Sequence, residues 1–346
     1  MKFLKELLND YYKSPSTFQA SRYWKKYEDK IIEEIKKADL NKLRSGVYSV
    51  FATFGFSEYI YSPKVKMPLY LKLLKKIKPS RHIVTHPDLP YSLKLKDIRE
   101  MAYMNCVNQG KLTNTKSIAK IETSDYGSPI DLFQLEGKNY TMQFFSYYIR
   151  LCYFNGVTKL KGDEVIVELG SGSGFQIEIL KKIYPDLTIL CFDLPYILLL
   201  GENYLCNALG NNTIVKSNKT IKWESLDKIE KGKVHMLGNW KFPLLKDYKF
   251  DIFWNAASFG EMEPDIVRNY LSYILQSCNI IYLLQARKGK ESTSEEGVVT
   301  PIKFEDYDSM LQNYKLLDKN DAFQAHRRLS QSGGYFQAVW KLETLK

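Results

Sequence analysis

Residues Val165–Phe175 read Val-Ile-Val-Glu-Leu-Gly-Ser-Gly-Ser-Gly-Phe, an apolar run followed by glycines at alternate positions. The apolar run predicts a buried strand over Val165–Leu169, and the residues after the glycines predict a helix over Phe175–Tyr184. Glycines between a strand and a helix allow a sharp turn and let the backbone approach a ligand without interference from a Cβ atom. The stretch therefore predicts a ligand site at the carboxyl end of a strand.

The same alternation of strand and helix continues towards the C-terminus. Further strands are predicted over Thr188–Asp193, Phe250–Asn255 and Asn279–Gln285, and further helices over Tyr196–Leu209 and Asp265–Gln276. Such alternation is typical of an α/β fold with a doubly wound, mostly parallel sheet that is covered on both faces. Two last β-rich segments, Tyr314–Asp318 and Tyr335–Leu342, leave little room for a helix between them, so we expect a terminal antiparallel hairpin.

The spacing of the glycines separates two classes of ligand. Gly170, Gly172 and Gly174 follow the pattern GxGxG, whereas a dinucleotide fingerprint is GxGxxG. The carboxylate of Glu168 would repel a pyrophosphate but attract the ammonium group of S-adenosylmethionine. Asp193, at the end of the next strand, could accept hydrogen bonds from two ribose hydroxyls or could cap the following helix. We expect S-adenosylmethionine as the cofactor, with a dinucleotide as the alternative.

Several stretches together carry a family resemblance. The glycine stretch, Phe192–Pro195, Gly238–Trp240 and Asp251–Met262 resemble class I S-adenosylmethionine-dependent methyltransferases with a Rossmann-like sheet. The whole chain, including Ser21–Trp24, is similar to bacterial sugar O-methyltransferases of surface-polysaccharide (O-antigen or capsule) gene clusters.

The resemblance implies a reaction and a set of site residues. The reaction is methyl transfer from S-adenosylmethionine to a sugar hydroxyl, on a sugar, nucleotide-sugar or glycan substrate. Asn239 would pair with the amine of the adenine, Met236 or Trp240 could stack on its ring, and Tyr147 or Arg150 could touch the cofactor's carboxylate. The expected cofactor site consists of Glu168, Gly170, Ser171, Gly172, Gly174, Asp193, Leu194, Asn239, Asn255 and Tyr147.

A sugar hydroxyl must lose its proton as it attacks the methyl group, and a positioned base accelerates such a step by about 10²–10⁴-fold. Similar O-methyltransferases place a histidine after the fourth strand, but Asn255–Glu263 contains none. Glu261 is the first candidate for the catalytic base, although it could instead hold the substrate or cap a helix. His326 is the second candidate, and Arg327 and Arg328 beside it could clamp a sugar-linked diphosphate. No metal is expected, because no residues have a recognisable ligand spacing, although a metal-assisted route through Glu261, Glu263 and Asp265 stays open.

Composition restricts the class of protein. The chain has 346 residues, of which 45% are hydrophobic, so a disordered chain is excluded. Its five cysteines are scattered without a CxxC pair, which indicates buried thiols in the reducing cytoplasm and excludes a disulfide scaffold. No stretch approaches the roughly 20 apolar residues that a membrane span needs.

The net charge of +11 lies mainly in the N-terminal region. We expect residues 1–135 to form a basic, mostly helical substrate region or lid, and residues 136–346 to form the methyltransferase domain. Helices are predicted over Trp24–Ile35 and Leu69–Lys78, and the second could associate weakly with an anionic membrane surface. Nucleic acid is not the expected partner, because no RNA-binding module accompanies the lysines. A methyltransferase for another small molecule or for nucleic acid, and a non-catalytic binding subunit, stay open as alternatives.

Overall fold

The computed structural model describes residues 2–53, 55–56, 60–63, 83–86, 94–275, 277–289, 298–322 and 334–343. The chain divides into two compact units. The first comprises Met1–Lys37, Val157–Ala322 and Gly333–Lys346, and the second comprises Ala38–Gly156 and Phe323–Ser332.

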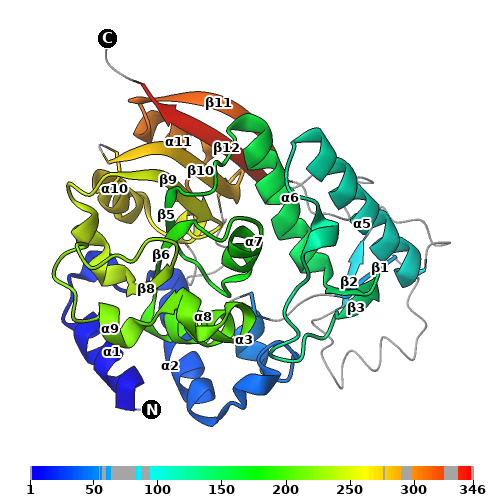
Figure 1. Cartoon of the computed structure of the whole chain (residues 1–346). Helices are drawn as coiled ribbons and strands as arrows, with labels where there is room; N and C mark the ends of the chain where they lie inside the picture. Colours follow the sequence, from blue (N-terminus) through cyan, green and yellow to red (C-terminus); the bar gives the residue numbers. More distant parts are fainter. Residues whose placement is uncertain are drawn as a thin grey trace. The chain divides into compact units, whose positions relative to one another are not determined.

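The first unit is built on an eight-stranded sheet with the order β11-β12-β10-β9-β5-β6-β8-β7 (Figure 1). Its strands are β5 (Val165–Leu169), β6 (Thr188–Asp193), β7 (Ile214–Val215), β8 (Val234–Gly238), β9 (Phe250–Ala256), β10 (Cys278–Ala286), β11 (Tyr314–Asp321) and β12 (Tyr335–Leu342). Strands β5 to β10 pair in parallel, and β12 pairs antiparallel with both β10 and β11. The predicted doubly wound sheet with a terminal antiparallel hairpin is therefore confirmed.

Helices cover both faces of this sheet. Helix α8 packs on β6 and β8 with α7 beside it, whereas residues of α10 and α11 join the buried cluster on the opposite face. The helices of this unit are α1 (Lys2–Tyr12), α2 (Arg22–Lys37), α7 (Phe175–Ile183), α8 (Pro195–Leu209), α9 (Ser217–Thr220), α10 (Pro264–Ser272) and α11 (Phe304–Met310).

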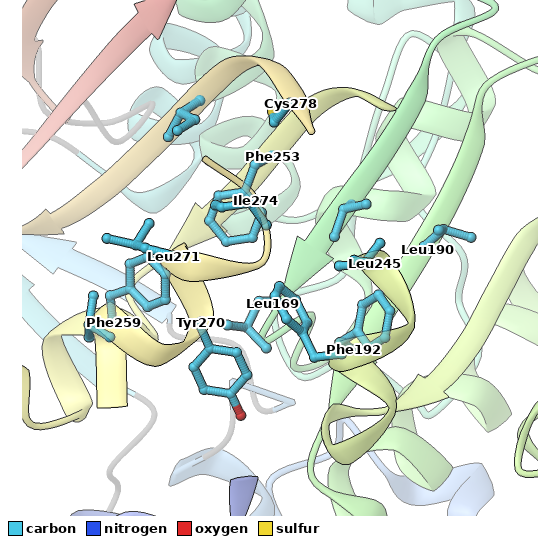
Figure 2. Close-up of a cluster of buried hydrophobic side chains, with 14 of the residues drawn as sticks. Leu169, Leu190, Phe192, Leu245, Phe253, Phe259, Tyr270, Leu271, Ile274 and Cys278 are labelled. Atoms are coloured by element: carbon cyan, nitrogen blue, oxygen red, sulfur yellow. The ribbon is translucent and has the colours of Figure 1, made fainter. Parts of the chain in front are cut away.

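A buried apolar cluster joins the sheet to α10. Figure 2 shows Leu169 of β5 and Phe192 of β6 on the sheet side, with Tyr270 and Leu271 on α10. Burying a large apolar side chain stabilises a fold by about 1.5–3 kcal/mol, so this cluster fixes α10 against the strand ends. The hydroxyl of Tyr270 points away from the apolar side chains of the cluster (Figure 2).

The N-terminal helices belong to the unit that contains the sheet. Leu7 and Tyr11 of α1 and the nearby Phe18 are buried in the same cluster, and α1 and α2 both contact α8. Residues 136–156, in contrast, belong to the second unit. The division therefore differs from the expected boundary after residue 135, because the apolar stripe of α1 is buried against the sheet unit.

The second unit is mostly helical. Its elements are α3 (Ser49–Thr53), β1 (Ile60–Pro63), β2 (Ile83–His86), α5 (Leu95–Leu112), β3 (Phe133–Leu135), β4 (Lys138–Tyr140) and α6 (Met142–Val157). Asp131 accepts hydrogen bonds from the Arg99 side chain of α5 (2.6 Å) and from the backbone N–H of Met142 (3.0 Å), which ties these two helices together. The predicted helix Leu69–Lys78 lies outside the described residues. Among the described helices, none has the length and apolarity to cross a membrane.

His235 of β8 is a fully buried titratable group. Its Nε2 atom accepts a hydrogen bond from the backbone N–H of Glu230 (3.0 Å), and its ring lies 5.6 Å from that of Trp223. Burial lowers the pKa of His235 from 6.5 to about 4. The folded protein therefore holds a neutral imidazole at pH values at which the unfolded chain is already protonated.

We expect His235 to weaken the fold in mild acid. A group whose pKa is lowered on folding contributes stability that is present above its unfolded pKa and is lost as the pH falls. Relative to a His235→Gln variant, the wild-type free energy of unfolding should decrease by on the order of 3 kcal/mol between pH 6.5 and pH 4. Urea unfolding of both proteins across this range measures the difference, and a difference independent of pH would contradict the assignment.

Candidate functional site

The turn after β5 needs glycine at two positions for reasons of space and backbone geometry. Gly170 has a φ of +77°, and an added Cβ would lie 2.5 Å from the Cβ of Ser258. Gly174, the residue before α7, has a φ of +78°, and its Cβ would lie 2.9 Å from the Leu205 side chain. L-residues rarely adopt such left-handed conformations, so other side chains would strain this turn and separate its neighbours.

Asp193 ends β6, and two backbone N–H groups hold its carboxylate. Gly172 donates to Oδ2 and Leu194 donates to Oδ1, both at 2.7 Å. Burial raises the pKa of Asp193 from 3.8 to about 7; the two backbone N–H groups lower the pKa, and the nearby Glu261 carboxylate raises it. A ligand that donates hydrogen bonds to this carboxylate would therefore favour its ionised form.

A cavity of about 60 Å³ opens at the carboxyl ends of β5 and β6. All of the residues around it belong to the first unit. They are Gln19, Ala20, Ser21, Trp24, Leu169, Gly170, Asp193, Leu194, Asn239, Ser258, Met262, Ile266 and Tyr270. Of the expected cofactor residues, the cavity thus brings together Gly170, Asp193, Leu194 and Asn239.

One wall of this cavity is formed by Gln19, Ala20, Ser21 and Trp24. These residues belong to the N-terminal segment Phe18–Trp24, which begins at the end of the 3₁₀ turn η1 (Ser16–Phe18). The Tyr11 hydroxyl accepts a hydrogen bond from the backbone N–H of Ala20 (2.5 Å). The Ser21 hydroxyl donates to the backbone carbonyl of Glu261 (2.8 Å). These bonds tie the wall to α1 on one side and to the loop after β9 on the other.

Asn239 follows β8 at the start of the 3₁₀ helix η5 (Asn239–Leu245) and is 5% exposed. Its Nδ2 group donates to the carbonyl of Phe18 (2.5 Å) and to the hydroxyl of Tyr270 (2.8 Å). Its Oδ1 atom is buried and has no hydrogen-bond partner among the described residues. An unpaired buried acceptor on the wall of a cavity is suited to a ligand that donates a hydrogen bond.

Trp240 and Met236 do not line this cavity. The indole N–H of Trp240 donates to Asp10 (2.6 Å), and its ring packs on Gly238, where an added Cβ would lie 2.3 Å from the indole. Met236 is buried within β8. The structure thus assigns Trp240 to holding α1, and not to the expected stacking on a ligand.

Asn255 at the end of β9 holds the following loop through four hydrogen bonds. Its Nδ2 group donates to the Leu169 carbonyl (2.9 Å) and to the Ser258 hydroxyl (2.6 Å). Its Oδ1 atom accepts from the backbone N–H of Phe259 (3.2 Å) and from the Gln285 side chain (2.6 Å). Because these bonds use both donors and both acceptor positions of the amide, we assign Asn255 to this loop and not to the expected contact with a cofactor.

Glu261 lies in the 3₁₀ turn η6 (Phe259–Glu261), directly after this loop, and is 8% exposed. Its carboxylate is close enough to Asp193 to raise the pKa of that residue, so the two acids share one end of the sheet. No group of three His, Cys, Asp or Glu side chains could hold a metal ion in the part of the chain that the structure describes. His326, Arg327 and Arg328 lie outside the described residues.

Of the other expected cofactor residues in the first unit, Glu168, Ser171, Gly172 and Gly174 do not line this cavity. Glu168 is buried in β5, in register with Cys191 of β6 and Trp254 of β9, and Ser171 lies in the turn itself. Tyr147 belongs to α6 of the second unit, where the Arg150 guanidinium lies 4.3 Å from its ring centre. Cofactor contacts of Tyr147 and of the four residues of the first unit stay predictions.

Sequence reasoning missed Tyr270 and the N-terminal wall. Tyr270 falls on the apolar face of the amphipathic helix α10, together with Val267 and Leu271. Its position therefore indicates a core residue and does not reveal the contact of its hydroxyl with Asn239. Gln19 and Ala20 carry no recognisable motif, and the strand-end residues that line the cavity with them are more than 140 positions away in sequence.

Comparisons with known proteins find similarity in solved structures alone. No family model matches the chain, and no curated protein matches it. A SAM-dependent methyltransferase from Aquifex aeolicus is 14% identical, with a TM-score of 0.35 over 53% of this chain and 84% of that one. Magnesium protoporphyrin IX methyltransferase from Synechocystis, with bound SAH, is 10% identical, with a TM-score of 0.38 over 57% and 82%. A fibrillarin/Nop5p complex is 15% identical, with a TM-score of 0.39 over 66% of this chain and 93% of that one. The functional assignment therefore depends on the site's own residues.

Proposed function

We propose that this chain is an S-adenosylmethionine-dependent methyltransferase that acts on a hydroxyl of a sugar. The observation that carries the proposal is the buried carboxylate of Asp193 at the end of β6, on the same cavity as Gly170 and the unpaired Oδ1 atom of Asn239. A strand-end carboxylate suits ribose hydroxyls, a glycine turn permits close approach, and an amide oxygen suits an exocyclic amine. These three features fit an adenosyl group.

The cofactor's place follows from this set. Asp193 would hold the ribose and Asn239 would hold the adenine. The cavity-lining side chains of Leu194, Met262 and Ile266 would exclude water from the adenine ring. When bound, S-adenosylmethionine supplies an electrophilic methyl group on its sulfonium centre. The chain's own residues must then orient the acceptor hydroxyl and take up its proton.

Glu261 is the proposed base. Its carboxylate lies at the same end of the sheet as Asp193, where it could accept the proton of an acceptor hydroxyl. Its backbone is fixed by Ser21 and by its own N–H, which donates to the carbonyl of Ser258 (3.0 Å). A fixed backbone limits the positions of the side chain, which favours its use in proton transfer. The sugar class and a role in surface-polysaccharide synthesis rest on the sequence resemblance.

Titration calorimetry with S-adenosylmethionine tests the proposal through Asp193. The pKa of Asp193 is about 7 without ligand, and ribose hydroxyls would bind the ionised carboxylate. Below pH 7 a proton must leave on binding, so the affinity should fall about tenfold per pH unit and level off above pH 7. The Asp193→Asn variant should bind more weakly and without this slope.

Asp251→Asn provides the matched control. Asp251 of β9 also accepts a hydrogen bond from a backbone N–H group, that of Val165 at 2.8 Å. Val165 begins β5, so this bond lies at the end of the strand that is remote from the cavity. This variant should keep the wild-type pH dependence of the affinity for S-adenosylmethionine. If the Asp193→Asn variant keeps the same pH dependence, the proposed role of Asp193 is wrong. Absence of any heat with S-adenosylmethionine would overturn the proposed function, and binding of NADH in its place would favour a dehydrogenase.

The Glu261→Gln variant tests the base. Loss of a general base should lower kcat for methyl transfer by about 10²–10⁴-fold, with the affinity for S-adenosylmethionine little changed. Radiolabelled methyl transfer to a panel of nucleotide sugars and glycans measures this effect and identifies the acceptor. Asp265→Asn, an exposed carboxylate in the first turn of α10, should retain full activity. Full activity of Glu261→Gln would remove Glu261 from the catalytic step.

A further inference from the structure

Asn239 and Tyr270 form a hydrogen-bonded pair on the wall of the cavity. The Nδ2 group of Asn239 donates to the hydroxyl oxygen of Tyr270 at 2.8 Å. Asn239 is 5% exposed and Tyr270 is 2% exposed, and both line the cavity. Phe18 and Phe242 hold the ring of Tyr270 edge-on, at 5.5 Å and 5.0 Å between ring centres. The pair is therefore fixed from both sides by packing.

The N-terminal segment determines which end of the Asn239 amide is available. The Phe18 carbonyl can only accept a hydrogen bond, and it lies 2.5 Å from Nδ2. The amide must therefore present its NH₂ group to Phe18 and Tyr270. Its Oδ1 atom, buried and unpaired among the described residues, can then only accept.

The hydroxyl of Tyr270 has the opposite character. Burial raises the pKa of Tyr270, so the hydroxyl keeps its proton at neutral pH. Its oxygen already accepts from Asn239, and no acceptor for its proton is found in the described part of the chain. A tyrosine hydroxyl has one proton to donate, so this group is a donor on the cavity wall.

We propose that Tyr270 determines the specificity of this site for adenine, with its hydroxyl donating to ring atom N1 beside the exocyclic amine that the proposed function places on the Oδ1 atom of Asn239. This inference rests on the proposed function and specifies how its nucleoside is selected. Hypoxanthine, in which a carbonyl replaces the amine and N1 carries a proton, has the reversed pattern. Both hydrogen bonds would then be mismatched, and the site would reject the inosyl analogue.

Calorimetry on the wild-type protein provides the first test. S-adenosylhomocysteine should bind about 100-fold more tightly than S-inosylhomocysteine, because each mismatched buried hydrogen bond costs roughly a factor of ten. Equal affinities for the two ligands would overturn the inference and leave the proposed function intact. Absence of binding by S-adenosylhomocysteine would overturn both.

The Tyr270→Phe variant provides the second test. It keeps the ring and its packing but removes the donor, so the ratio of the two affinities should fall to about tenfold, mainly through weaker binding of S-adenosylhomocysteine. Tyr273→Phe is the matched control. Tyr273 lies three residues further on, and its ring also contacts those of Phe18 and Phe242, but it does not line the cavity. This control should keep the wild-type ratio, and a Tyr270→Phe variant with the same ratio as the control would overturn the role of Tyr270.

Discussion

The hydrogen bond from the Gly172 N–H to the Asp193 carboxylate joins the turn after β5 to the end of β6. A buried carboxylate without donors is costly, and here two backbone N–H groups supply them. Gly172 can direct its N–H there because the turn runs through left-handed conformations, with a φ of +56° at Gly172 itself. The glycines and the acid are thus one structural unit, and distortion of the turn would leave a buried charge unpaired.

The parallel sheet then brings the rest of the site to this unit. Strands β5, β6, β8 and β9 run in the same direction, so the residues that follow them emerge at one edge. Gly170, Asp193, Asn239 and Ser258 each follow or end one of these strands, and all four line the cavity. Residues nearly 90 positions apart in sequence therefore meet without any long loop having to reach across the fold.

The sequence predicted those parts of the fold whose pattern is local. Strands such as Val165–Leu169 and Thr188–Asp193 are mostly apolar runs, which are typical of buried parallel strands, and both have the predicted bounds. The two-residue strand β7 is too short to show a period. The role of Asn255 depends on Gln285 and on a carbonyl of β5, which are tertiary neighbours. For the same reason the wall formed by Phe18–Trp24 could not be predicted, since nothing within that segment identifies Asn239 or Glu261 as its partners.

This wall changes the interpretation of the basic N-terminal region. Its first part is not an appendage: Leu7, Tyr11 and Phe18 are core residues of the sheet unit. The same segment bonds Asn239 through the Phe18 carbonyl and the backbone of Glu261, the proposed base, through the Ser21 hydroxyl. Displacement of the segment would break both bonds at once, freeing the Asn239 amide to rotate and the η6 turn to move. The proposed nucleoside site and the placement of the proposed base would therefore be linked through seven residues of the chain, by hydrogen bonds that do not involve the basic side chains of that region.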